Sequence, residues 1–108
     1  MNLKIDKAVF RVCEARTKPG KLEMLRQKLS STSVAVVNGE PGNLGYFFGE
    51  PLSSENDSLV FVSVWESLDA IKRRFGADWQ ESFLPEGYGD LIEICSIRHF
   101  RFDGEIRS

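Results

Sequence analysis

Hydrophobic and polar residues alternate along several short stretches of the chain, and one of these stretches is apolar on both of its faces. Residues 58–65 predict a strand whose two alternating sets are Leu59, Phe61, Ser63 and Trp65 on one side and Val60, Val62 and Val64 on the other. An antiparallel strand with one solvated face is apolar on one side only. We therefore expect this strand to be covered on both sides.

The same periodicities predict three further strands and two helices. The strands are expected over residues 7–16, 43–50 and 91–102. A first helix runs from about residue 21 and ends at Asn38-Gly39. A second helix follows Ser67, which suits an N-cap, and Gly76 breaks it before residues 78–84 resume it for a turn or two.

The resulting order, βαββαβ, predicts a single α+β domain over residues 1–108, with its core at about 8–102. With right-handed crossovers this order gives a ferredoxin-like fold, in which a four-stranded antiparallel sheet carries two helices on one face. We expect the helices to cover Phe10, Val12, Val60, Val62, Val64, Phe100 and Phe102. The opposite face would then hold Arg11, Cys13, Phe61, Ser63, Trp65, Cys95, Ile97 and His99. That face is too apolar to be left in water, so a second copy of the chain is expected to cover it in a homodimeric barrel.

Composition narrows the possible functions. The chain has 108 residues, 28% of them charged, and a net charge of −2 without a concentrated basic surface, which argues against nucleic-acid binding. No apolar run reaches membrane-spanning or signal-peptide length, so no membrane association and a cytoplasmic location are expected. Cys13 and Cys95 lie far apart, without CxxC spacing, and are interpreted as small buried hydrophobes. Neither metal-ligand spacing nor a nucleotide-binding loop is present, so no cofactor is expected.

Four segments carry a resemblance to a known family. They are Arg-Thr-Lys-Pro-Gly-Lys21, Glu-Pro-Gly-Asn-Leu-Gly-Tyr46, Val-Trp-Glu-Ser-Leu-Asp-Ala70 and Arg-His-Phe-Arg-Phe102. Together they resemble the antibiotic-biosynthesis monooxygenase family of dimeric α+β barrels. The resemblance implies the ferredoxin-like dimeric fold, and it is less specific for chemistry because this fold hosts many activities.

Better understood members of that family oxidise polycyclic phenols with O₂ and need neither metal nor flavin, whereas others degrade haem or modify quinols. In the haem-degrading branch the site consists of an Asn on the first strand, a Trp at the end of the third and a His on the second helix. Trp65 matches that pattern, but Cys13 stands at the first-strand position and the second helix has no His. Haem degradation of that kind is therefore not expected.

Two residues are candidates for catalysis. Trp65 would offer a flat wall and an indole N–H to an aromatic ligand, or it would only pack a dimer core. His99, the only histidine, would take a proton from a phenol or enol, or as a cation steady the resulting anion. Its alternative interpretation is a hydrogen-bonded structural histidine at the interface.

The candidate substrate-binding residues are Arg11, Cys13, Tyr46, Phe61 and Ser63. An inward Arg11 would be costly unless it met an anion, and a rim position is the alternative. The leading hypothesis is a cofactor-independent monooxygenase, or a related small enzyme, acting on a planar aromatic or quinone-like molecule. The alternatives are a non-catalytic dimer of the same fold that binds a small ligand or serves as a stress-related accessory protein, and a dimer whose barrel interior is simply filled.

Overall fold

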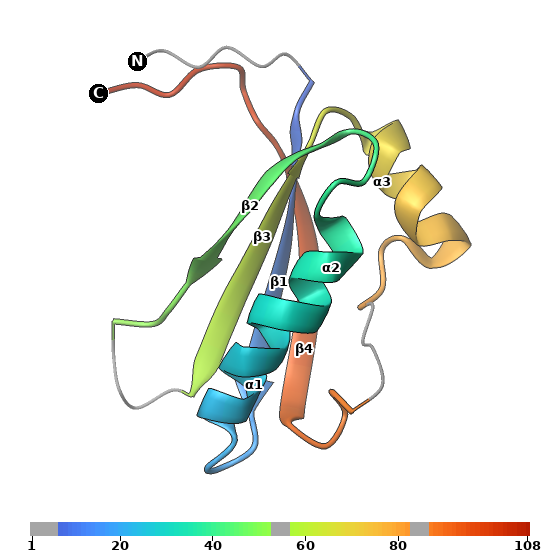
Figure 1. Ribbon diagram of the computed structural model, residues 1–108. Coiled ribbons are helices and arrows are strands. Elements are labelled where there is room, and N and C mark those ends of the chain that lie inside the picture. Colours follow the sequence, from blue (N-terminus) through green and yellow to red (C-terminus); the bar gives the residue numbers. More distant parts are fainter. Residues whose placement is uncertain (1–6, 53–56, 83–86) are drawn as a thin grey trace.

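The computed structural model describes residues 7–52, 57–82 and 87–108 (Figure 1). Its strands and α-helices, in chain order, are β1 (Val9–Thr17), α1 (Leu22–Lys28), α2 (Val34–Val37), β2 (Asn43–Gly49), β3 (Ser58–Trp65), α3 (Leu68–Phe75) and β4 (Ile92–Arg101). A π-helical turn, Leu29–Ser33, joins α1 to α2, and a 3₁₀ turn, Gly76–Asp78, follows α3. None of the helices in these ranges is long and apolar enough to cross a membrane.

The strands form one antiparallel sheet in the order β2-β3-β1-β4, and the helical segments lie on one side of it (Figure 1). This arrangement confirms the predicted α+β, ferredoxin-like class. β1 occupies a central position, with Val12 opposite Val62 of β3 and Arg98 of β4. Because all pairs are antiparallel, residues that lie opposite each other share a face, and the register assigns every strand residue to one of two faces.

The helical segment between β1 and β2 contains a turn that the sequence analysis did not predict. Leu25, Leu29, Ser33 and Val37 are all buried, at a spacing of four residues. In a regular α-helix each such step rotates the side chain by about 40°, so three steps would turn it by about 120° and out of the buried stripe. The π-helical turn has more residues per turn than an α-helix, so it offsets that rotation and keeps the four side chains on the buried side. Just outside the stripe, Ser30 Oγ donates to the Arg26 carbonyl at 2.9 Å, a side-chain bond of the kind that bends helices.

The prediction of which sheet face the helices cover is wrong. Leu25, Leu29 and Ile71 from the helices share one core with Phe61 and Trp65. The helices therefore cover the face of Arg11, Cys13, Phe61, Ser63 and Trp65, the set that the sequence analysis had assigned to the partner. Both sets are apolar on β3, so alternation separates them without saying which one lies under the helices. The larger side chains, Trp65 above all, fill the space beneath the helices.

Within the described ranges, no helix lies on the other face of the sheet (Figure 1). It holds Phe10, Val12, Phe47, Val60, Val62, Val64 and Phe100. Phe47 is 51% exposed and Phe100 is 46% exposed, while Phe102 stacks on Phe10 with ring centroids 5.7 Å apart. We call this surface the open face. Because the open face is apolar, a covering partner is still expected. It would lie on the side of the sheet opposite to the one first expected.

The connection from α3 to β4 departs from the sequence prediction. Ser67 does cap α3, since its Oγ accepts from the Ala70 N–H at 3.2 Å, and Gly76 ends the helix with a φ of 77°. The helix does not resume over residues 79–82, which form turns and bends. Residues 83–86, the rest of the expected second piece, lie outside the described residues.

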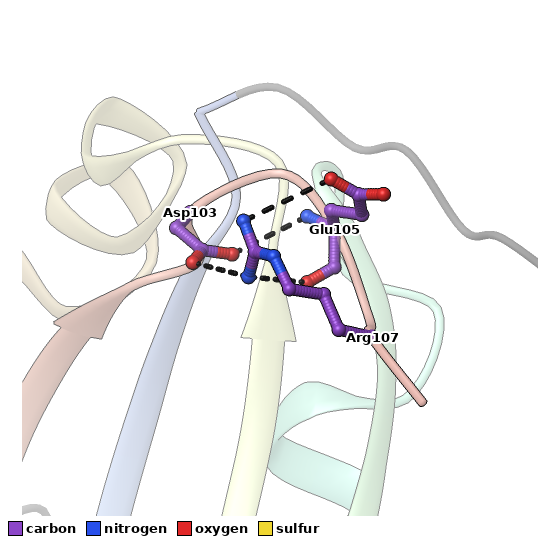
Figure 2. Close-up of polar contacts among 3 residues, drawn as sticks. All are labelled: Asp103, Glu105 and Arg107. Carbon is purple, nitrogen blue, oxygen red and sulfur yellow. Dashed lines mark hydrogen bonds and ion pairs between the residues drawn. The ribbon is translucent and has the colours of Figure 1, made fainter.

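After β4 the chain continues into a short segment with its own ion pairs. Figure 2 shows the Arg107 guanidinium between two carboxylates, 2.8 Å from Asp103 and 3.8 Å from Glu105. The hydrogen bond from Arg107 lowers the pKa of Asp103. All three side chains are exposed, so this cluster adds little to stability and encloses no site.

Candidate functional site

A cavity lies between the sheet and the helices, within one chain. Its volume is about 40 Å³, and it is partly open to solvent. The lining residues come from every layer and are Arg11, Cys13, Ala15, Leu29, Ser33, Val36, Val37, Phe61, Ser63, Phe75, Tyr88, Ile92 and Ile97. Four predicted site residues, Arg11, Cys13, Phe61 and Ser63, are thus brought together here. The other three, Trp65, His99 and Tyr46, lie next to the lining residues and outside the wall.

Arg11 is the charged residue of the cavity wall, and it is buried, with 5% of its surface exposed. Its guanidinium donates to the carbonyl oxygen of Trp79 and, at 3.0 Å, to that of Glu81, and it lies 3.9 Å from the centre of the Phe75 ring. Burial lowers the pKa of Arg11 to about 10, so it remains a cation at neutral pH. In the described part of the chain no carboxylate forms an ion pair with it. A buried cation without a carboxylate partner attracts an anion strongly.

His99 lies beside Arg11, because Arg11 and His99 face each other across β1 and β4. The Arg11 guanidinium is 3.1 Å from Nε2 of His99. A guanidinium can only donate, so Nε2 accepts and the imidazole is neutral, with its proton on Nδ1. The ring also packs edge-on against Trp79 with centroids 5.0 Å apart. The structure thus gives Arg11, rather than His99, the positive charge of this site.

The neutral state of His99 leads to a prediction for its titration. Burial, and secondarily the charge of Arg11, lower the pKa of His99 below its ordinary value of 6.5. Because this is the only histidine in the chain, its NMR signal can be followed without assignment, and its midpoint is expected below that value. Arg11→Met should raise the midpoint partway, since burial remains. A midpoint above 6.5 in the unmodified protein would contradict this arrangement.

The lowered pKa of His99 also determines how the stability of the protein changes with pH. The unfolded chain takes up a proton on His99 as the pH falls through about 6.5, while the folded chain resists it. The contribution of His99 to the free energy of unfolding is therefore fully present above about pH 6.5 and is lost as the pH falls below that value. His99→Gln should flatten this acid-side loss of stability, measured as the urea midpoint at successive pH values.

Trp65 and Ser63 form a pair beneath the cavity. Trp65 is fully buried, packs edge-on against Phe75, and donates its indole N–H to Ser63 Oγ at 2.8 Å. The indole N–H is thus used within the protein. A hydroxyl accepts and donates at once, so Ser63 can hold Trp65 and still turn its own hydrogen toward the cavity. Trp65 therefore packs the core of its own chain beneath the helices, rather than the dimer core that was its alternative interpretation.

Phe61 connects the cavity to an aromatic cluster on β2. Its ring stacks on Phe48 with centroids 5.1 Å apart and meets Tyr46 edge-on at 6.1 Å. Tyr46 is 38% exposed, so it lies at the outer side of this cluster. Phe61, which lines the cavity, can contact a ligand there. Tyr46 packs against Phe61 from the outer side.

Sequence reasoning missed Tyr88 and Ser33, which line the cavity together. The two hydroxyls are 2.7 Å apart, and Tyr88 also donates to the Lys28 carbonyl at 2.8 Å. Burial raises the pKa of Tyr88. A signal for both existed in the sequence: Ser33 interrupts an apolar stripe of four-residue spacing, and Tyr88 is an aromatic residue between two glycines. The described residues contain no cluster of three or more His, Cys, Asp and Glu that could hold a metal ion.

Comparison with known proteins identifies the family. The family model for antibiotic biosynthesis monooxygenase matches residues 8–83, so this chain belongs to that family, as its resemblance implied. No curated protein matches the chain.

Several solved structures share the fold. PA3566 from Pseudomonas aeruginosa is 19% identical with a TM-score of 0.70, covering 91% of this chain and 96% of its own. A protein of unknown function from Nitrosomonas europaea is 11% identical with a TM-score of 0.71, covering 96% and 97%. SnoaB from Streptomyces nogalater, a cofactor-independent oxygenase, is 21% identical with a TM-score of 0.63, covering 94% and 96%. At such identities the likeness shows the fold alone.

Proposed function

We propose that this protein is a cofactor-independent oxygenase for a planar phenol, enol or quinol, which it binds as an anion in the cavity beside Arg11. The single observation that carries the proposal is the buried guanidinium of Arg11, which has no ion pair with a described carboxylate and lies in the wall of an otherwise mostly apolar cavity. Family membership and the shared fold with SnoaB, itself a cofactor-independent oxygenase, support the same reaction class.

The residues of the cavity suit the two demands of this chemistry. A phenolate or enolate carries its negative charge on oxygen, and the Arg11 cation stabilises that charge in a site of low dielectric. The carbon skeleton is apolar and flat, which matches Phe61, Phe75 and Leu29. The cavity of about 40 Å³ has room for a few waters or one O₂, which is less than the usual small-ligand pocket, so binding of the ring system requires the cavity wall to open.

The reaction needs no external reductant. An electron-rich anion gives electrons to O₂, a carbon–oxygen bond forms, and loss of water from the resulting peroxide at a CH₂ centre leaves a carbonyl. One oxygen atom enters the product and the other leaves as water, so the substrate supplies all the electrons. The protein then has only to position the substrate and stabilise its anion, and His99 can accept the proton at Nε2 once the Arg11 guanidinium turns from that nitrogen to the substrate anion.

We also propose that two copies pair through the open face. Two-fold pairing of sheets over Phe47 and Phe100 would bury side chains that a single chain leaves in contact with water. In this arrangement each cavity remains on the helix side of its own sheet, so each chain carries a complete site.

The activity is tested with EDTA-treated protein, a panel of tricyclic phenols and anthrones, and an oxygen electrode. We expect O₂ uptake above the rate in buffer and, under ¹⁸O₂, one labelled oxygen atom in the product. A ligand that binds stoichiometrically without O₂ uptake would favour the alternative, a small-ligand-binding protein of the same fold.

A further inference from the structure

Two thiols meet at the wall of the cavity. Cys13 on β1 and Cys95 on β4 are 82 residues apart in sequence, and their Sγ atoms are 3.5 Å from each other. Both are free and half-buried, and Cys13 lines the cavity. The sequence interpretation as two unrelated buried hydrophobes did not anticipate this contact. Two thiols in hydrogen-bond contact form a pair with chemistry of its own.

The sheet register holds the pair just short of a bond. Cys13 lies opposite Ile97 and Cys95 lies opposite Ala15, so the two cysteines are diagonal neighbours on one face. Diagonal Cα atoms are about 7–8 Å apart, and disulfides usually span about 4.4–6.8 Å. Forming the bond therefore requires a small shift of β4 along β1. A disulfide formed under such strain is more easily reduced than a relaxed one.

The surroundings give the two sulfurs different roles. Either sulfur can donate in the contact between the two thiols, and their interaction lowers the pKa of Cys95, with help from Ser82 and the Arg11 cation. The same interaction and burial raise the pKa of Cys13. Of the two sulfurs, Cys95 is therefore the one that loses its proton more readily, and Cys13 is the one that holds it. The thiolate is the nucleophilic form of cysteine. The pair therefore contains one sulfur suited to attack and one suited to complete a disulfide.

We propose that Cys13 and Cys95 form a redox pair that reduces small hydroperoxides, with Cys95 as the attacking and Cys13 as the resolving residue. The space beside Cys13, about 40 Å³, accommodates a molecule of hydrogen peroxide size. The proposal stands on the contact of the two sulfurs and on the place of Cys13 in the cavity wall, with Cys95 directly behind it, and it does not depend on the oxygenase activity.

The reaction has two balanced steps. The Cys95 sulfur attacks one peroxide oxygen, a sulfur–oxygen bond forms, the oxygen–oxygen bond breaks, and the leaving oxygen takes a proton to become water or an alcohol. The Cys13 sulfur then attacks Cys95, and the hydroxyl leaves as water with the Cys13 proton. The two sulfurs lose two electrons in all, and the peroxide gains them. An external thiol returns the pair to its reduced form by exchange.

The test uses the whole reduced protein and one equivalent of hydrogen peroxide, followed by alkylation and mass spectrometry. We expect a mass lower by about 2 Da, no alkylated cysteine, a cross-linked peptide containing Cys13 and Cys95, and full reversal by dithiothreitol. Free thiols after peroxide treatment, or a disulfide between two chains, would overturn the proposal.

Two matched variants separate the roles. Cys13→Ser should stop at a sulfenic acid on Cys95 that dimedone traps, and Cys95→Ser should react with peroxide about tenfold more slowly. Equal rates in Cys95→Ser and the unmodified protein would refute the assignment. Because a variant can fail to fold, the unmodified protein supplies a further check: iodoacetamide at neutral pH should label Cys95 before Cys13, and the opposite order would also refute the roles.

Discussion

Arg11→Met is expected to lower the rate of oxygenation by about 10²–10³-fold while leaving the protein folded and at least as stable as before. Its guanidinium is buried without a carboxylate partner, and replacing a buried charge by an apolar side chain of similar length is often neutral or stabilising. The carbonyl groups of Trp79 and Glu81 that lose their donor lie near the surface, where water can replace it. A loss of activity with retained stability is the signature of a residue kept for its ligand.

The measurement pairs O₂ uptake and anion binding with a urea unfolding curve. Arg11→Lys keeps the charge but lacks the fork that reaches both carbonyls and His99, so an intermediate rate is expected. Arg73→Met, on the exposed side of α3, is the control for simple loss of positive charge. If Arg11→Met unfolds the protein and Arg11→Lys is fully active and stable, Arg11 is a structural residue and the assignment of the anion site is wrong.

Phe47→Glu is expected to weaken association of two copies by at least about a thousandfold. In a two-fold pairing of open faces each chain would place one unpaired carboxylate against an apolar surface, at a cost of several kcal/mol for each. In the isolated chain the same side chain is 51% exposed, so the fold itself should tolerate the change. Sedimentation from nanomolar to micromolar concentration measures the shift.

Tyr46→Glu is a closely matched control, because Tyr46 is the neighbour of Phe47 on β2 and faces the helix side of the sheet. The dimer should survive this change. If Tyr46→Glu dissociates the dimer and Phe47→Glu does not, the chains pair through the other side of the sheet. An unmodified protein that stays monomeric at micromolar concentration would remove the proposed interface altogether.

Much of the fold followed from the sequence because its signals are local. Alternation over residues 58–65 and the Ser67 cap predicted β3 and the start of α3 where the structure has them. Alternation also sorted Arg11, Cys13, Phe61 and Ser63 onto one face, and these four residues do share a cavity wall. Alternation could not show which of the two faces lies under the helices. Both sets of β3 side chains are apolar, and which set lies under a helix depends on packing between segments distant in sequence.

The parts of the site that the sequence did not predict depend on such distant contacts. Arg11 meets His99, and Cys13 meets Cys95, only because β1 and β4 pair in one particular register. A shift of that register by one residue would send each of these side chains to the other face. The π-helical turn and the position of Tyr88 likewise follow from how the helical segment settles over the sheet. Spacing along the chain contains none of this information.

The alternation of β1 between cavity and open face has a consequence for how such proteins diversify. Odd positions, such as Arg11 and Cys13, face the cavity, and even positions, such as Phe10 and Val12, face away from it. Substitutions at odd positions can therefore retune ligand choice while the outer surface stays constant, and the reverse also holds. Selection can act on the two properties separately within one nine-residue strand. Chains with this fold and sequence identities near 20% are what such independent variation would produce.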